Sequence, residues 1–190
     1  MRIINTDIEG IFIFEPDVYA DERGYFFESF SERDFTRLTG IDMYFVQDNE
    51  SRSKAGVVRG LHFQRPPHAQ SKLVRVVEGE ILDVAVDIRR GSPTFGRYVA
   101  TVLSGENHRQ LFIPRGFAHG FVARRDSIVA YKCDSLYAPE CEGAIRWDDS
   151  TLAIDWCIDH DQAILSKKDL ANATLDECGE LFDYNTNYYA

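Results

Sequence analysis

The sequence predicts a mainly β protein, with short strands arranged as a sandwich or barrel in one domain, residues 1–190. Short runs rich in Val, Ile and aromatic residues alternate with turn residues along most of the chain, which is typical of these folds. Aromatic residues make up 13% of the chain, with 13 Phe and 9 Tyr, and favour strands over helices. A length of 190 residues fits one domain, and a hydrophobic content of 44% is enough for a core.

The first regular element is predicted to be a short helix over Glu32–Leu38. Ser31 is a typical N-cap residue with Asp34 three positions later, and Gly40 provides the C-terminal stop. The strands are then predicted at Tyr44–Ser51, Val57–Phe63, Ser71–Val77, Glu80–Ile88, Tyr98–Leu103, Gln110–Ile113, Gly120–Ala123 and Ile128–Cys133.

Two further elements follow from local signals. Gly79 separates Lys72–Val77 from Ile81–Ile88, so these strands are predicted to pair as a hairpin. Near the end of the chain, Lys167–Leu181 is predicted as a helix because Leu170 is one of several spaced apolar residues there. The aromatic tail that follows fits no element.

Strand alternation indicates a polar interior. Lys72 shares a strand face with Val74 and Val76, and Asp83 shares one with Asp87. In the same way Tyr131 shares a face with valine and cysteine. Charged side chains on faces that also carry apolar residues are unusual in a pure packing core. A barrel with a ligand-holding interior explains this pattern.

Composition restricts the function classes. The net charge is −10 and the pI is about 4.9, which disfavours general binding to nucleic acid or to an anionic membrane. The N-terminus lacks a signal-peptide pattern, and no run of 18 apolar residues occurs. The four cysteines form no CxxC pair and match no zinc-site spacing. Because the chain shows no signal-peptide pattern, we expect reduced thiols and a cytoplasmic protein.

Two histidines are candidates for chemistry. His62 lies in a strand-loop-strand unit that also carries Arg59, Arg65 and Lys72, which is either a solvated basic patch or a site for an anionic ligand. His119 is either a buried core histidine or a pocket residue. Metal binding is not expected, because His62 is followed by Phe and Gln and the His-x-His pair of metal-binding barrels is missing.

Blocks of residues match, in the same order, the motifs of a known family: Asp21–Phe30, Phe45–Asn49, Val58–His62, Lys72–Val77, Asp83–Gly96, Ile113–Phe121, Tyr131–Lys132 and Gly143–Asp149. On these blocks the chain resembles the dTDP-4-dehydrorhamnose 3,5-epimerases from about residue 2 to residue 184. The resemblance implies a cupin-type double-stranded β-helix (jelly-roll) barrel, a homodimer, a dTDP-sugar substrate and no cofactor.

The resemblance also implies roles for single residues. His62 corresponds to the catalytic base, Asp169 to its carboxylate partner and Tyr131 to the general acid, while Tyr137 matches the aromatic residue that stacks on thymine. The other positions that contact substrate in the family are Arg23, Glu28, Gln47, Asn49, Arg59, Lys72, His119, Glu142 and Lys168. Cys133 and Leu136 stand where polar or aromatic residues are more usual.

These residue types suit an epimerisation next to a ketone. Imidazole has an ordinary pKa of about 6.5, so His62 would be largely neutral and basic at pH 7. Tyr131 would return a proton to the opposite face, and Lys72 would stabilise the oxyanion. Arg59 and Arg23 suit a diphosphate, because guanidinium pairs with phosphate oxygens through parallel hydrogen bonds.

Three other functions compete with this interpretation. The first is a single-position epimerase, acting at C3 or C5 alone in another deoxysugar pathway, which would use the same residues. The second is a metal-dependent enzyme on the same fold, which the missing His-x-His pair disfavours. The third is a non-catalytic sugar- or nucleotide-binding barrel, which would not need His62, Asp169 and Tyr131 together.

Overall fold

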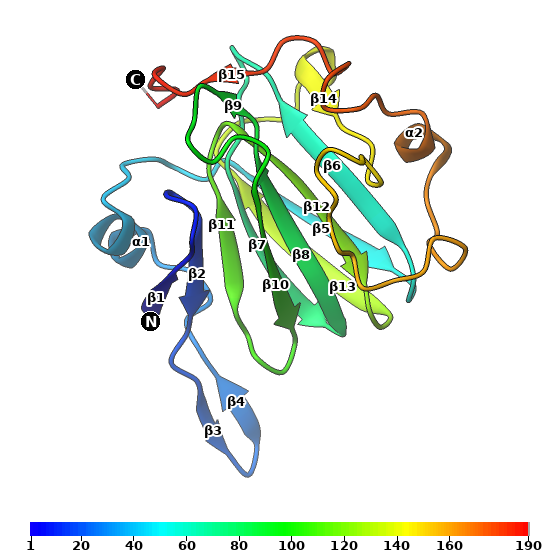
Figure 1. Cartoon of the computed structure of the whole chain (residues 1–190). Coiled ribbons are helices and arrows are strands. Elements are labelled where there is room, and N and C mark those ends of the chain that lie inside the picture. Colours follow the sequence, from blue (N-terminus) through cyan, green and yellow to red (C-terminus); the bar gives the residue numbers. More distant parts are fainter. Residues whose placement is uncertain (190) are drawn as a thin grey trace.

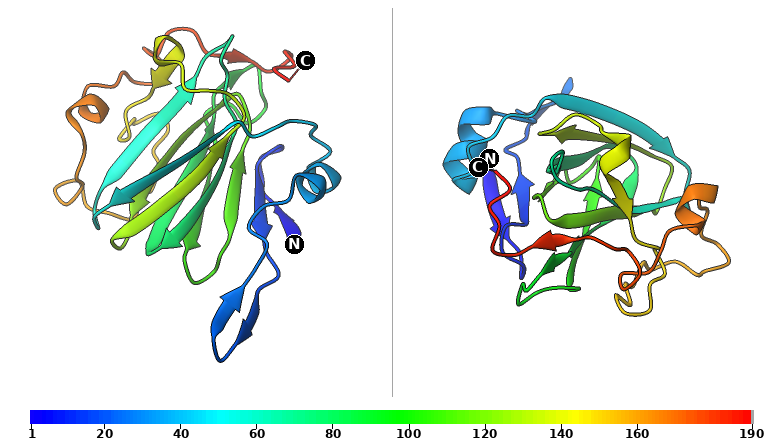
Figure 2. Two further views of the ribbon diagram at one scale, coloured as in Figure 1. Left: turned by 180° about the vertical axis from the view of Figure 1, so that it is seen from behind. Right: turned by 90° about the horizontal axis from the view of Figure 1, so that it is seen from above.

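Two antiparallel sheets face each other in the computed structural model of the chain, which describes residues 1–189 (Figures 1 and 2). The larger sheet has six strands in the order β1 (Arg2–Asn5), β2 (Phe12–Glu15), β11 (Gln110–Ile113), β7 (Lys72–Glu78), β13 (Ser127–Cys133) and β5 (Gln47–Ser53). The smaller has five, in the order β10 (Tyr98–Ser104), β8 (Glu80–Asp87), β12 (Phe117–Ala123), β6 (Val58–Gln64) and β14 (Glu142–Ala144). The predicted mainly β, cupin-type fold is therefore confirmed.

The chain crosses between the sheets as it winds. From β5 to β8 each successive strand lies in the other sheet, and the same alternation runs from β11 to β14. The predicted hairpin of Lys72–Val77 with Ile81–Ile88 is therefore wrong, because β7 pairs with β11 and β13 whereas β8 pairs with β10 and β12. Gly79 does form a tight turn, at φ 85°, but this turn carries the chain from one sheet to the other.

Helix α1 (Glu32–Thr39) confirms the predicted first helix. Ser31 caps it by accepting a hydrogen bond from the Asp34 N–H, and Gly40 ends it in the left-handed conformation. The helix packs Phe35 against Phe14 and Phe112 on the outer face of the larger sheet.

The predicted C-terminal helix over Lys167–Leu181 is wrong beyond its first turn. Helix α2 covers only Lys167–Leu170. Beyond it, the carbonyl of Ala173 accepts a hydrogen bond from Arg146, and the N–H of Leu175 donates to the buried carboxylate of Asp149 at 2.7 Å. These contacts with the preceding loop replace helical hydrogen bonds, and Leu175 is buried against the smaller sheet.

Smaller elements complete the fold. The strands β3 (Tyr19–Asp21) and β4 (Gly24–Phe26) form a hairpin that projects away from the two sheets (Figures 1 and 2). Pro139–Cys141 forms a 3₁₀ turn before β14. Close to the C-terminus, β15 (Phe182–Asp183) pairs in parallel with β9 (Arg89–Arg90). Within residues 1–189 no helix is long and apolar enough to cross a membrane.

The space between the sheets holds a core that confirms the predicted strand faces. Val74, Val76 and Val129 are buried there together, on the strand faces that also carry Lys72 and Tyr131. A second cluster covers the outer face of the smaller sheet and includes Trp147 and Trp156. The interior therefore presents polar side chains at one end of an otherwise apolar core.

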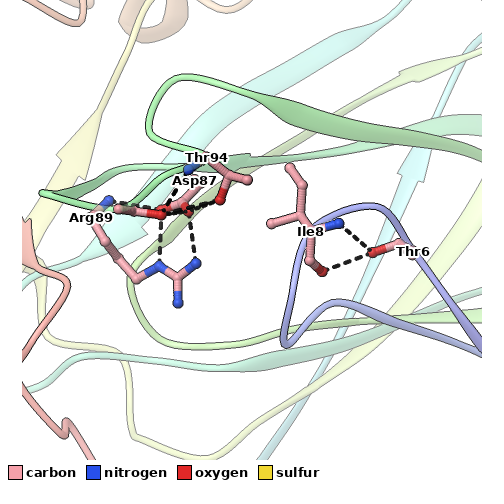
Figure 3. Close-up of polar contacts among 6 residues, drawn as sticks. Thr6, Ile8, Asp87, Arg89 and Thr94 are labelled. Carbon is pink, nitrogen blue, oxygen red and sulfur yellow. Dashed lines mark hydrogen bonds and ion pairs between the residues drawn. The ribbon is translucent and has the colours of Figure 1, made fainter.

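Asp87 departs from the predicted ligand-holding role of its strand face. Its carboxylate is fully buried and accepts hydrogen bonds from the Arg89 side chain at 2.9 and 2.7 Å, as Figure 3 shows. The hydroxyl groups of Ser92 and Thr94 donate to it at 2.6 Å each. Asp87 thus stabilises the turn that carries β9. Figure 3 also shows Thr6 closing the turn before β2 by bonding to Ile8.

Candidate active site

One cavity gathers most of the residues that the family resemblance singles out. It has a volume of about 330 Å³ and opens at one end of the space between the sheets. Strands β5, β6, β7, β13 and β14 supply its walls, together with the loops that lead into β7 and β14. The lining residues are Gln47, Asn49, His62, Phe63, Gln64, Gln70, Lys72, Tyr131, Tyr137 and Glu142.

His62 and Asp169 meet across 107 positions of sequence, with 2.6 Å between His62 Nε2 and Asp169 Oδ1. His62 lies on β6, and Asp169 lies on α2, where it is almost fully buried. Ser166 fixes the carboxylate: its hydroxyl donates to Asp169 Oδ2 at 2.7 Å and accepts from the Asp169 N–H at 3.0 Å.

The charge of Asp169 determines which nitrogen of His62 is basic. Burial raises the pKa of Asp169, but hydrogen bonds from His62 and Ser166 outweigh it, and the net pKa is lowered. The carboxylate is therefore ionised at neutral pH and accepts the Nε2–H of His62. The other ring nitrogen, Nδ1, keeps its lone pair and is the basic one.

Tyr131 and Lys72 form the opposite part of the cavity wall. The Lys72 ammonium lies 5.9 Å from the centre of the Tyr131 ring. Desolvation by burial lowers the pKa of Lys72, and the charges of Asp83 and Glu142 oppose this shift. Desolvation raises the pKa of Tyr131, so its phenol is neutral at pH 7 and can donate a proton.

The rim of the cavity is a polar network around Tyr137. The Tyr137 N–H donates to Gln47 at 2.9 Å, and its hydroxyl donates to the Glu142 carboxylate at 3.0 Å. Lys168 also donates to Glu142, at 2.6 Å, and its pKa is raised by that hydrogen bond. Gln47 in turn donates to Asn49. The ring of Tyr137 is more than half exposed and free to stack on a ligand.

His119 and Arg59 lie close to the cavity without lining it. His119 sits directly across the β6–β12 pair from His62 and bonds through Nε2 to Asp83 at 2.6 Å. The side chains of His119 and Asp83 are both buried. Arg59 donates to the Ser53 hydroxyl at 3.0 Å, and its charge opposes the upward shift of the Tyr131 pKa.

Arg23 and Glu28 lie outside this cavity. Arg23 is on the turn of the β3–β4 hairpin, where it pairs with Asp21 at 2.6 Å. Glu28 is an exposed residue between that hairpin and α1. The single chain therefore does not bring these two predicted substrate contacts to the residues around His62.

Some residues of the site carried no role in the sequence interpretation. Asp83, the partner of His119, was visible as a charged residue in an apolar strand. Ser166 precedes Asp169 at the spacing of a helix cap. Gln64 bonds to the backbone of Leu136 and Ala138 and so holds the segment of Tyr137. Only the contacts made in the fold reveal this last role.

Cys133 is a buried wall residue beside the cavity. Desolvation raises the pKa of its thiol to about 11, so the group is neutral. Its sulfur accepts a hydrogen bond from the Asn49 amide at 3.6 Å. Leu136, the other departure from the family pattern, is an exposed residue. Among residues 1–189, no three or more His, Cys, Asp or Glu side chains are grouped to hold a metal ion.

Comparison with known proteins gives one consistent result. The family model described as dTDP-4-dehydrorhamnose 3,5-epimerase matches residues 5–177. The protein of that name from Methanothermobacter thermautotrophicus is 54% identical over 170 residues, covering 88% of this chain and 91% of that protein. Its namesake from Salmonella typhimurium is 51% identical, covering 93% of this chain and 97% of that protein.

A solved structure shares both the fold and much of the sequence. It is dTDP-6-deoxy-D-glucose-3,5-epimerase from Legionella pneumophila in complex with dTDP-4-keto-L-rhamnose. This structure aligns with a TM-score of 0.93 at 50% identity, covering 97% of this chain and 99% of that chain. The similarity therefore includes the strands and loops that build the cavity.

Proposed function

The chain belongs to the dTDP-4-dehydrorhamnose 3,5-epimerase family, and on that premise we propose that it inverts both C3 and C5 of dTDP-4-dehydro-6-deoxy-D-glucose. The product is dTDP-4-dehydro-L-rhamnose. The observation that carries the proposal is the pair of His62 and Asp169, in one cavity with Tyr131 and Lys72.

His62 is the proposed base for both inversions. The ketone at C4 acidifies the hydrogens on C3 and C5, and Nδ1 of His62 removes one of them as a proton. The electron pair of the broken C–H bond passes into the C4 carbonyl to give an enolate. Asp169 stabilises the imidazolium that forms, because it is ionised and 2.6 Å from Nε2.

Tyr131 and Lys72 complete each inversion. The ammonium of Lys72 stabilises the enolate oxygen, in a desolvated position where the charge acts strongly. Tyr131 donates its phenolic proton to the carbon from the face opposite His62. Before the second inversion Tyr131 takes up a proton from solvent and His62 releases one to it. Inversion needs this second face, because return of the proton from His62 would restore the original configuration.

The remaining residues are proposed to bind the nucleotide. Tyr137 stacks on thymine, and Arg59 binds the diphosphate through its guanidinium. The other proposed contacts are Gln47, Asn49, His119, Glu142 and Lys168. Each step moves only protons, so we propose no cofactor and no metal. The four free thiols support a cytoplasmic setting, where cysteines stay reduced.

We also propose a homodimer, which accounts for Arg23 and Glu28. The β3–β4 hairpin exposes Tyr25 at 59% and Phe26 at 71%, and large apolar side chains presented together are typical of an interface. A hairpin docked on a second copy would bring Arg23 toward the partner's cavity. Phe26→Glu is expected to give a monomer with weakened dTDP-sugar binding, measured by light scattering and titration calorimetry. A dimeric Phe26→Glu variant with normal binding would refute the arrangement.

The proposed activity is tested by proton NMR of dTDP-4-dehydro-6-deoxy-D-glucose incubated with the protein in D₂O. Deuterium at both C3 and C5, with a product that a rhamnose-forming reductase accepts, is the expected result. Exchange at one carbon alone would instead identify a single-position epimerase. The His62→Ala variant is expected to lose exchange at both carbons while still binding dTDP. Normal exchange in that variant would exclude His62 as the base.

A further inference from the structure

Residues 182–189 return to the sheet end that carries the site, although they lie beyond the residues matched by the family model. Tyr188 contacts both residues of β15: its hydroxyl accepts the Asp183 N–H at 2.7 Å, and its ring meets the Phe182 ring edge-on at 5.0 Å. Figures 1 and 2 show this segment crossing one end of the two sheets, from the side of α2 toward the side of α1. The tail is therefore docked by specific contacts.

Tyr189 closes a network of four residues, Ser71, Arg115, Asp134 and Tyr189, called here the Tyr189 network. The Tyr189 hydroxyl accepts from the Arg115 N–H at 3.1 Å and lies 2.7 Å from the Ser71 hydroxyl. The Arg115 side chain lies over the Tyr189 ring and donates to Asp134 at 3.0 Å. Asp134 in turn accepts the Ser71 N–H at 2.6 Å. All four residues are thus linked in a closed circuit.

Two members of the Tyr189 network are sequence neighbours of residues at the cavity. Ser71 immediately precedes Lys72, and Asp134 immediately follows Cys133, while Lys72 and Cys133 are paired across β7 and β13. Ser71 is fully buried, and its hydroxyl has the Tyr189 hydroxyl and the Asp134 carboxylate as its polar neighbours. The network therefore fastens the two strands together at the end where Lys72 enters the cavity.

Lys72 depends on its backbone for position. Within residues 1–189 its ammonium has no hydrogen bond and no ion pair, and its contact with the Tyr131 ring, at 5.9 Å from the ring centre, is a weak one. Tyr137 differs, because Gln47 and Gln64 hold its segment directly. Loosening the Tyr189 network would therefore displace Lys72 more than Tyr137.

We infer that Tyr189 is a positioning residue for the reaction, acting through Ser71 to hold Lys72 at the enolate oxygen. The inference deepens the proposed function and rests on the role of Lys72 given there. It assigns to the C-terminal tail a part in the chemical step and none in nucleotide binding.

The test is Tyr189→Phe, which keeps the ring beneath Arg115 and removes only the hydroxyl. The Arg115 N–H then lacks its acceptor and Ser71 loses its bond to the tail, so kcat is expected to fall about tenfold. KM and the Kd for dTDP are expected to change less than about twofold, since Tyr137 is held separately. The matched control is Tyr184→Phe in the same tail. Its hydroxyl makes no hydrogen bond within residues 1–189, and kcat is expected to stay at the wild-type value.

A double-mutant cycle tests whether Tyr189 acts through Ser71. Ser71→Ala combined with Tyr189→Phe is expected to be no more impaired in kcat than Tyr189→Phe alone. The inference is overturned if the kcat losses of the two single variants multiply in the double variant. It is also overturned if Tyr189→Phe keeps the wild-type kcat, or if its affinity for dTDP falls as much as its kcat. Lys72→Met, measured alongside, tests the proposed role of Lys72 by itself. The role of Lys72 and the positioning role of Tyr189 can therefore fail separately.

Discussion

His62 and Tyr131 must work in opposite senses within one cavity, and their surroundings differ accordingly. His62 is bonded to an ionised carboxylate, which favours its accepting a proton. Tyr131 is desolvated, which keeps its phenol protonated until a strong base forms beside it. The two side chains are thus prepared for removal and return of a proton before substrate binds.

Tyr131→Phe is expected to separate hydrogen removal from inversion. Loss of the phenol removes the proton donor but leaves His62 and Lys72 in place, so solvent exchange should survive better than inversion. Inversion should fall by about a hundredfold or more. NMR of the sugar in D₂O reports both events in one experiment. Equal losses of exchange and inversion would contradict a pure acid role for Tyr131.

The lowered pKa of Lys72 predicts the alkaline limit of activity. Lys72 stabilises the oxyanion only while protonated, so kcat/KM is expected to fall as pH rises, at a pH below the ordinary lysine value of 10.5. Lys72→Arg should abolish this limb, because guanidinium stays charged throughout that range. Tyr131 titrates later, since its pKa is raised above 10.0. An unchanged alkaline limb in Lys72→Arg would assign it to another group.

At the scale of elements, the site depends on close contact between β6 and β12. Gly60 has a positive φ of 126°, and a Cβ there would lie 2.4 Å from the Gly120 Cα. The register between these strands shifts at His119, next to this contact. Two glycines facing each other thus allow His62 and His119 to lie side by side in the sheet.

Gly60→Ala is expected to destabilise the protein by about 3 kcal/mol or more, because neither backbone can move without disturbing the sheet. Chemical denaturation monitored by circular dichroism measures the change in the free energy of unfolding. Gly91→Ala is the control: it also has a positive φ, but its Cβ would meet no atom within 4 Å. Similar costs for both variants would mean that φ strain alone, and not the strand contact, sets the effect.

At the scale of the whole molecule, the charge balance is dominated by carboxylates that the fold keeps ionised. Despite burial, hydrogen bonds lower the pKa of Asp87, Glu142 and Asp169. Asp134 shifts the other way, because its burial outweighs its bonds to Ser71 and Arg115. Carboxyl groups with a lowered pKa outnumber those with a raised pKa among the described residues. The folded state therefore binds fewer protons than the unfolded chain.

Stability is therefore expected to be lost in acid. Carboxyl groups with lowered folded-state pKa values stabilise the fold above their unfolded values, about 3.8 for Asp and 4.5 for Glu. That contribution disappears as pH falls through and below this range. Thermal melting from pH 7 to pH 3 should show a falling Tm below about pH 4.5. A Tm that stays constant or rises there would contradict the expected balance.

The sequence alone determined the strand faces and the first helix, and it named most of the residues that line the cavity. Alternation placed Lys72 with Val74 and Val76 correctly, because a strand's period of two is a local property of the backbone. Ser31 and Gly40 bounded α1 for the same reason, since caps act within one turn. The family resemblance named His62 and Asp169 without showing how they meet.

Only the tertiary structure decided the long-range pairings. It separated β7 from β8, which Gly79 had suggested as a hairpin, because turn residues specify a reversal but not the sheet that receives the next strand. It ended α2 at Leu170, where hydrogen bonds to the loop at Asp149 outweigh local helix propensity. It also brought Asp169 to His62 and Tyr189 to Ser71. These contacts span about a hundred positions, and local sequence carries no record of them.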